Sequence, residues 1–258
     1  MSWIWKIVLI GSILVNILAV WGYFSYVKYG GNPLGDLKRK LTGGDKVGPP
    51  RTPWAEESAA IRKEIAEGKT DPLRVVFFGA SITNRWDLQT TFPEIHAINR
   101  GMGGQLAPQF LPRFKRDVID LKPRAVMIKF CSINMRPEMS QQSLKDAMDM
   151  LCQLATANGI VAIPATIIPA GKAEARISDY SVVDSLREFN DWLRQYASDK
   201  QLPLIDFAKS IEDENGFLPR ECAVDPVHVN ERGYEILAEA ARPVLHRVLG
   251  LSSQSSIQ

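Results

Sequence analysis

Cysteine and histidine, from which disulfide frameworks and most metal sites are built, are scarce in this sequence. Only three cysteines and three histidines occur among 258 residues. Cys131, Cys152 and Cys222 are an odd number and lack the paired spacing of zinc ligands. We therefore expect neither a disulfide-stapled fold nor a metal centre.

An excess of charge of either sign is also missing. Lys and Arg together number 31 against 29 Asp and Glu, and no basic stripe is interleaved with aromatic residues. A nucleic-acid partner is therefore not expected, because such partners are held by clusters of positive charge. With 45% hydrophobic residues, the chain can fill one ordinary core once its N-terminal segment is set aside.

One long apolar run is present, near the N-terminus. Residues 7–27 contain no charge in 21 positions, and as a helix they would span about 31 Å, which matches a bilayer core of about 30 Å. Aromatic side chains suited to the headgroup region stand at its two ends: Trp3, Trp5, Trp21, Tyr23 and Tyr26. Because the run ends in bulky residues, we expect residues 1–28 to form an uncleaved single-pass anchor. A cleaved signal peptide and a buried core helix are the less favoured interpretations.

The orientation of this anchor is open. More basic residues follow the run than precede it: Lys28, Lys38, Arg39 and Lys40 against Lys6. The positive-inside rule would place the following domain in the cytoplasm, but long domains cross membranes largely regardless of such charges.

The rest of the chain divides into a tether, a domain and a tail. Residues 29–51 are rich in Gly, Pro and basic residues and show no apolar period, which predicts a tether. Thr52 can cap a first helix, with Pro53 at its first position and Gly68 just past its end. We expect one domain over residues 52–250 and a disordered tail over 251–258.

Within this domain, short apolar runs alternate with longer amphipathic ones, which predicts a parallel sheet covered by helices on both faces, an α/β fold. The expected strands are 74–78, 97–99, 125–130, 160–166 and 204–207. The expected helices are 105–121, 141–158, 182–200 and a last one from an Asn230 cap to about 249.

Polar groups follow the predicted strands, and ligands bind at that edge of a parallel sheet. Ser81 comes after the first strand, Gly101, Gly103 and Gly104 after the second, and Asn134 after the third. Asp225 and His228 stand three apart around Pro226, in a segment that favours a turn. A serine hydroxyl needs an imidazole to take its proton and a carboxylate to orient that imidazole, so these residues indicate nucleophilic catalysis.

From about Leu73 to Leu249 the sequence resembles the SGNH hydrolases, or GDSL-type esterases. The resemblance implies a flavodoxin-like three-layer α/β/α sandwich, Ser81 as nucleophile, Asp225 and His228 as acid and base, and an oxyanion hole formed by Ser81, Gly104 and Asn134. Ala80, Ser132 and Met135 depart from the family pattern, which has Asp, Gly and Asp there. An α/β-hydrolase elbow is rejected, because Thr83 stands where that motif requires Gly.

Each of these residues also has a simpler interpretation. Ser81 could cap a helix, Asn134 could cap a turn, and Asp225 could start one. His96 and His246 are expected to be structural or surface groups. Neighbours of the expected catalytic residues in the sequence are candidates for the pocket wall: Arg85, Trp86, Met102, Gln105, Met135 and Arg136.

The leading hypothesis is a membrane-anchored serine esterase that removes an O-acyl group, O-acetyl above all, from a cell-envelope carbohydrate, without metal or organic cofactor. For that substrate an extracytoplasmic domain is favoured. Alternatives are an O-acyltransferase to sugar hydroxyls and a lysophospholipase or thioesterase. A non-catalytic envelope-binding scaffold is the alternative outside enzymology, made conceivable by Ala80 and Met135.

Overall fold

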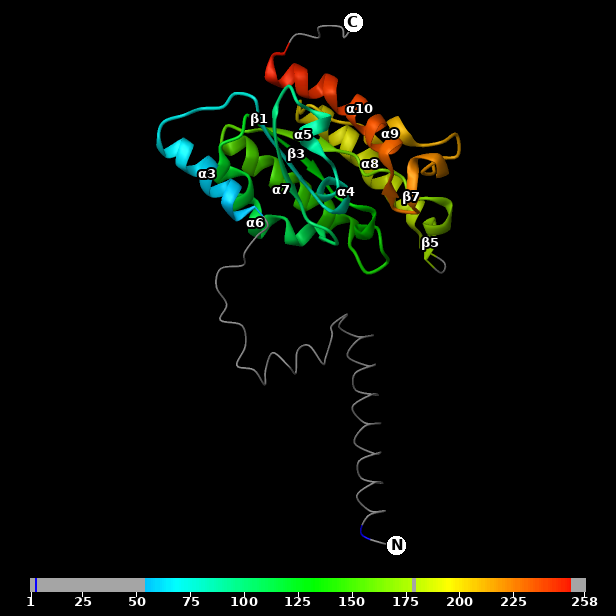
Figure 1. Ribbon diagram of the computed structural model, residues 1–258. Coiled ribbons are helices and arrows are strands. Elements are labelled where there is room, and N and C mark those ends of the chain that lie inside the picture. Colours follow the sequence, from blue (N-terminus) through cyan, green and yellow to red (C-terminus); the bar gives the residue numbers. More distant parts are fainter. Residues whose placement is uncertain (1–2, 4–53, 178–179, 252–258) are drawn as a thin grey trace, which may run out of the picture. The chain divides into compact units, whose positions relative to one another are not determined.

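Four short apolar segments form a parallel sheet at the centre of the fold (Figure 1). They are β1 (Arg74–Gly79), β2 (His96–Gly101), β3 (Ala125–Lys129) and β4 (Val161–Ala165), in the order β2-β1-β3-β4. The register places Val76 beside Ile98 on one side and Val126 on the other. Every residue of β1 and β3 is buried, so both faces of the sheet are covered, as parallel sheets require.

The computed structural model describes residue 3 and residues 54–177 and 180–251. The expected anchor and tether, the Thr52 cap and residues 252–258 of the expected tail lie outside this part. The described residues from Glu56 onward belong to one compact unit. Among the described residues, none of the helices combines the length and the apolar character needed to cross a membrane.

Helices connect the strands. They are α3 (Ala55–Ala66), α4 (Ser81–Asn84), α5 (Leu88–Thr91), α6 (Leu111–Asp117), α7 (Gln141–Ala157), α8 (Val182–Asp199), α9 (Phe207–Ile211) and α10 (Glu231–Leu249). Two small hairpins are formed by β5 (Arg176–Ile177) with β6 (Tyr180–Ser181), and by β7 (Ala223–Asp225) with β8 (His228–Val229). Short 3-10 turns lie at Ala107–Gln109, Ile119–Leu121, Ser132–Asn134, Lys172–Glu174 and Arg220–Cys222.

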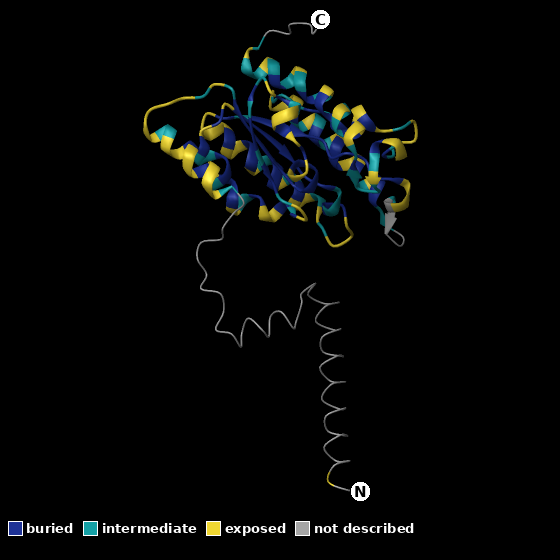
Figure 2. Cartoon of the chain, in the orientation of Figure 1, coloured by how far each residue is buried: buried dark blue, intermediate teal, exposed yellow. Residues whose placement is uncertain are grey.

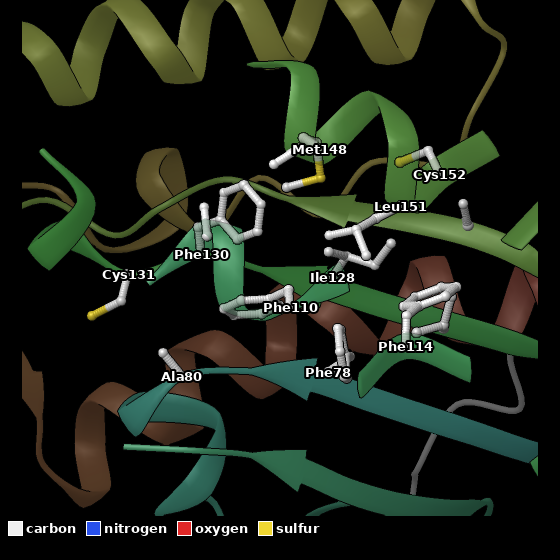
Figure 3. Packing of buried hydrophobic residues seen from close by; sticks show 14 of the residues in the cluster. Phe78, Ala80, Phe110, Phe114, Ile128, Phe130, Cys131, Met148, Leu151 and Cys152 are labelled. Atoms are coloured by element: carbon white, nitrogen blue, oxygen red, sulfur yellow. The ribbon is translucent and has the colours of Figure 1, made fainter. Parts of the chain in front are cut away.

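The two faces of the sheet carry separate apolar clusters, and Figure 2 shows buried residues concentrated between the sheet and the helices. On one face, side chains of β1 and β3 pack against α6, α7 and α8; Phe78 meets Phe110 and Phe114 edge to face (Figure 3). On the other face, Phe77 and Met127 pack with side chains of α9 and α10. The α/β fold with a parallel sheet is therefore confirmed.

Most of the expected elements are confirmed within one or two residues at their ends. The helices expected over 141–158 and 182–200 are α7 and α8, and α10 follows its expected Asn230 cap, whose Oδ1 accepts a hydrogen bond from the N–H of Gly233 at 3.1 Å. Gly250 ends α10 with a φ of 69°. These boundaries follow from side-chain capping and from the freedom of glycine at positive φ.

Two expectations were wrong. The strand over 204–207 is reduced to a single bridge between Ile205 and Ala165, because Asp206 already caps α9 through the N–H of Lys209. The helix over 105–121 is divided into two 3-10 turns and the short α6. Pro108 and Pro112 lack the N–H of a helix interior and therefore start new turns.

The last residue of β3, Lys129, is a buried cation, with only 1% of its surface exposed. Its ammonium donates to the carbonyl of Phe130 at 3.3 Å. Burial lowers the pKa of Lys129 to about 8, because charge is disfavoured away from water. The folded state therefore binds this proton less tightly than the unfolded chain does.

This depressed pKa predicts a stability that depends on pH. The unfolded chain holds more protons than the folded one between about pH 8 and 10.5, so the contribution of Lys129 to stability should rise with pH through that window. Below about pH 8 the full cost of burying the charge remains. Lys129→Met should therefore raise the free energy of unfolding at pH 7 by about 3 kcal/mol and remove this rise.

Urea unfolding of both proteins at pH 7 and pH 10 measures the difference. Comparing the two proteins cancels the titration of other groups. An equal free-energy difference at the two pH values would contradict a depressed pKa for Lys129.

Candidate active site

Ser81 is the first residue of α4, directly beyond the end of β1, and is largely buried. Two glycines allow α4 to lie this close to the sheet. A Cβ on Gly79 would come within 2.0 Å of the Thr83 hydroxyl, and one on Gly101 within 2.1 Å of the Asn84 backbone nitrogen. A larger residue at either position would displace the loop that carries Ser81.

His228 approaches Ser81 from the other end of the chain. Its Nε2 lies 3.0 Å from the Ser81 Oγ, across 147 residues of sequence. The hairpin of β7 and β8 pairs Asp225 with His228, and the His228 Nδ1 lies 2.8 Å from the Asp225 Oδ2. The three expected catalytic residues are thus joined in one hydrogen-bonded chain.

The Asp225 carboxylate is fixed by its own turn. Its Oδ1 accepts hydrogen bonds from the backbone N–H groups of Val227 and His228, each at 2.9 Å. Desolvation alone would raise the pKa of Asp225, but these hydrogen bonds and the His228 ring outweigh it and hold that pKa below its ordinary value. The carboxyl group is therefore ionised at neutral pH and can accept from the Nδ1–H of His228.

Ser81 and Gly104 are the two expected backbone donors to an oxyanion. Gly104 has a φ of 70°, a conformation that strains residues with a side chain. Ser81 and Gly104 both border the cavity described below. Within the described residues, neither N–H donates a hydrogen bond.

Asn134 is placed differently. Its side chain is fully buried; its Oδ1 accepts from the N–H of Ala107 at 2.8 Å, and its Nδ2 donates to the carbonyl of Cys131 at 3.0 Å. The contact with Cys131 lies within the turn, as a turn cap would, and the contact with Ala107 ties the loop after β3 to the loop after β2. One of its two amide hydrogens is engaged in this arrangement.

Two further polar residues hold the ends of the strands together. Arg113 of α6, largely buried, donates to the carbonyls of Gly79 and Arg100 and to the side chain of Gln105. Asn99 donates to the Thr83 carbonyl at 2.7 Å and accepts from the Gly101 N–H at 2.8 Å. Sequence reasoning missed both; for Arg113 the available signal was a basic residue beside Phe110 and Phe114 on an apolar helix face.

A cavity of about 500 Å³ opens at Ser81 and His228. Of the six candidates for its wall, Arg85, Met135 and Arg136 line it, whereas Trp86, Met102 and Gln105 do not belong to its lining. Other lining residues, none of which was a candidate for the wall, are Asn84, Gly103, Cys131, Ser132, Ile133, Ala170, Val182 and Val227. The Cys131 Sγ lies 3.9 Å from the Ser81 Oγ.

The misplaced candidates have structural roles. Trp86 is 3% exposed and packs against Phe77, Phe92, Phe207 and Tyr234. Gln105, 5% exposed, accepts from Arg113 through its side-chain oxygen. Nearness in sequence failed for Trp86 because neighbouring residues after Ser81 face different surroundings: Arg85 lines the cavity, whereas Trp86 belongs to an apolar cluster of the core.

The other two histidines also contact carboxylates. His96 lies 2.5 Å from Asp71, and His246 lies 3.1 Å from Glu94. Contact with a carboxylate therefore does not distinguish His228; contact with a serine hydroxyl does. No group of three or more His, Cys, Asp or Glu side chains in the described part of the chain is arranged to hold a metal ion.

Comparisons with known proteins give the family of this chain. The model of the GDSL-like lipase/acylhydrolase family matches residues 65–236. The chain belongs to this family. GDSL-like acylhydrolases are ester hydrolases, so the protein is an enzyme of that class. None of the curated proteins matches the chain.

Among solved structures, a GDSL-like lipase from Bacteroides thetaiotaomicron is similar at 25% identity and a TM-score of 0.63, over 74% of this chain and 98% of that one. A putative acylhydrolase from Bacteroides fragilis is similar at 26% identity and a TM-score of 0.66, over 80% and 100%. An acetyl-xylooligosaccharide esterase from Geobacillus shares the fold, at 19% identity and a TM-score of 0.56, over 71% and 96%.

The buried contacts of Asn134 predict a loss of stability in Asn134→Ala. The Ala107 N–H would lose its acceptor, and an unsatisfied buried donor costs about 1–3 kcal/mol. If the second amide hydrogen also reaches an oxyanion, kcat should fall by about 10² to 10³ with little change in KM.

Asn134→Asp serves as the comparison, because it keeps an oxygen for Ala107 and removes the amide donor. Thermal unfolding and steady-state kinetics on both variants separate the two roles. A lowered melting temperature with unchanged kcat in the Ala variant would leave Asn134 with the structural role alone.

Proposed function

We propose that the protein hydrolyses an O-acyl ester through an acyl-enzyme formed on Ser81. The observation that carries this proposal is the chain of hydrogen bonds from Ser81 through His228 to Asp225. A serine held in this way is the activated nucleophile of acyl-transfer enzymes. Membership of the GDSL-like family supports an ester as the substrate.

In the first half-reaction, the His228 Nε2 takes the Ser81 proton while the Ser81 Oγ attacks the ester carbonyl. Asp225 holds the imidazole in the required tautomer and stabilises its protonated form. The negative oxygen that develops on the carbonyl accepts hydrogen bonds from the N–H groups of Ser81 and Gly104. Collapse of the tetrahedral intermediate expels the alcohol, which receives its proton from His228.

In the second half-reaction, water attacks the acyl group on Ser81 while His228 removes its proton. Release of the acid restores the Ser81 hydroxyl. The second hydrogen of the Asn134 amide is the proposed third donor to the oxyanion. Neither half-reaction requires a metal or an organic cofactor.

We further propose a short acyl group, acetyl above all, on a carbohydrate of the cell envelope. The Cys131 thiol lies in contact with the Ser81 hydroxyl and limits the room on that side. A cavity of about 500 Å³ is far larger than an acetyl group requires, which leaves space for the alcohol part. The same fold carries an acetyl-xylooligosaccharide esterase in Geobacillus.

The cell-envelope part of the proposal rests on the N-terminal sequence. An uncharged run of 21 residues with aromatic side chains at both ends supports a single-pass membrane anchor over residues 1–28. Residues 29–51 would then tether the enzyme to the membrane. An extracytoplasmic domain is proposed, because envelope carbohydrates lie on that side.

A nucleophilic Ser81 predicts covalent labelling by a fluorophosphonate probe. Ser81→Ala should lose both the labelling and the hydrolysis of 4-nitrophenyl acetate while its circular dichroism spectrum stays that of the wild type. The wild type should cleave the acetate faster than the butyrate and octanoate. Equal labelling of the Ser81→Ala variant would contradict the mechanism, and faster cleavage of the octanoate would contradict a short acyl group.

A spanning anchor predicts that the full-length protein sediments with membranes and resists extraction by alkaline carbonate. Removal of residues 1–51 should release the domain into the soluble fraction. Alkaline phosphatase and a cytoplasmic reporter, each fused after Gln258, show on which side of the membrane the domain lies. Extraction by carbonate would overturn the anchor, and an inactive phosphatase with an active cytoplasmic reporter would overturn the proposed orientation.

A further inference from the structure

The cavity at Ser81 has an unbalanced charge. Apart from His228, its charged lining residues are Arg85, which follows α4, and Arg136, which follows the turn after β3. No Asp or Glu side chain belongs to its described lining. Two guanidinium groups therefore stand at a cavity wall that holds no carboxylate.

Both guanidinium groups are available to a ligand. Several other arginines are paired, as Arg194 is with Asp206 and Arg242 with Glu94. Within the described residues, neither Arg85 nor Arg136 forms an ion pair or a side-chain hydrogen bond, and both side chains are exposed. A guanidinium carries five N–H donors in a planar fork that suits carboxylate and phosphate oxygens.

The two arginines differ in their surroundings. Arg85 also borders a second hollow, whose lining includes four carboxylates: Asp87, Glu231, Glu235 and Glu239. These carboxylates offset part of its positive charge at longer range. Arg136 borders the Ser81 cavity without such neighbours among the lining residues. Arg136 is therefore the stronger of the two potential anion contacts.

How deep each lining residue lies in the cavity indicates which part of an ester substrate would reach the two arginines. Ser81 and Cys131 are 9% and 6% exposed, so the reacting hydroxyl and the thiol beside it lie at the bottom. The exposed arginines stand at the mouth. An ester whose carbonyl reaches Ser81 and whose acyl group is short can extend to the mouth only through its alcohol part.

We propose that the substrate is an anionic ester, with a carboxylate or phosphate group on its alcohol part, which Arg136 binds and Arg85 assists in binding. The inference rests on the proposed function, because it assumes that Ser81 cleaves the ester. It deepens that function by naming a charge that the substrate must carry. Arg136 then determines specificity and takes no part in the bond-breaking steps.

A matched pair of esters tests this proposal. The anion 4-acetoxybenzoate and its neutral methyl ester share the acetyl group and the phenol, and release of the phenol reports the hydrolysis of each. The wild type should have the higher kcat/KM for the anion. Arg136→Ala should lower the ratio of the two kcat/KM values by roughly 10-fold, the size expected for one charge-assisted hydrogen bond. Using the ratio cancels general damage to the enzyme.

Arg124→Ala is the control. Arg124 is also exposed and forms no ion pair within the described residues, but it precedes the amino end of β3, whereas Arg136 follows the carboxyl end. This variant should keep the wild-type ratio. Arg136→Lys should retain part of the preference, Arg136→Glu should reverse it, and Arg85→Ala should lower the ratio less than Arg136→Ala does.

Two further pairs of esters distinguish which kind of molecule carries the anionic group. Acetylated glucuronate against the acetylated neutral glucoside tests a carbohydrate, and acetylglycerol phosphate against acetylglycerol, which keep the short acyl group, tests a lipid headgroup. An Arg136-dependent preference in either pair supports the proposal and names the source. Equal ratios in the wild type and Arg136→Ala would overturn the inference and leave the proposed function standing. No Ser81-dependent hydrolysis of any ester would overturn both.

Discussion

The hydrogen bond between the Ser81 hydroxyl and the His228 imidazole joins α4 to the β7–β8 hairpin, across 147 residues of sequence. Its length of 3.0 Å leaves little tolerance, because hydrogen bonds weaken steeply as distance and angle change. The sheet must therefore hold the end of β1, and α10 must hold the β7–β8 hairpin, in fixed relation. Tyr234 supplies one direct link, since its hydroxyl donates to the Ile82 carbonyl at 2.8 Å.

The position of the Ser81 nucleophile is set by close packing of the backbone of α4 against the ends of the strands, not by large side chains. Gly79 and Gly101 leave no room for a Cβ beneath α4, and Gly233 leaves none between α10 and β8, where a Cβ would come within 2.6 Å of the Cys222 carbonyl. Each of these glycines lies where a helix meets the end of a strand. Glycine there shortens the distance between elements and so brings the catalytic loops within hydrogen-bond reach.

The sequence was sufficient for the features that depend on local pattern. The apolar runs predicted the four strands, and Asn230 predicted the start of α10. The spacing around Pro226 predicted that Asp225 and His228 lie close together. It was insufficient where tertiary contacts decide. Trp86 was expected in the pocket but packs into the aromatic cluster around Phe77. The apolar residues around Arg113 could have indicated its burial, but not that its guanidinium reaches the carbonyl of Gly79.

Buried cations gather near the carboxyl ends of the strands. Arg100 is the last residue but one of β2, Lys129 ends β3, and Arg113 lies against both β1 and β2. Strand ends leave backbone carbonyls without partners in the ladder, and buried carbonyls must find donors. Arg113 supplies several donors at once, and its charge is matched by the buried carboxylate of Asp117 at 3.1 Å. Desolvation lowers the pKa of Arg113 to about 10, and Asp117 limits that fall, so the guanidinium stays charged at neutral pH.

In this chain Ala80 stands where the family pattern has an acidic residue, and it is buried among apolar side chains. The backbone on either side of Ser81 is instead held by Arg113, which donates to the carbonyl of Gly79, and by Asn99, which donates to the carbonyl of Thr83.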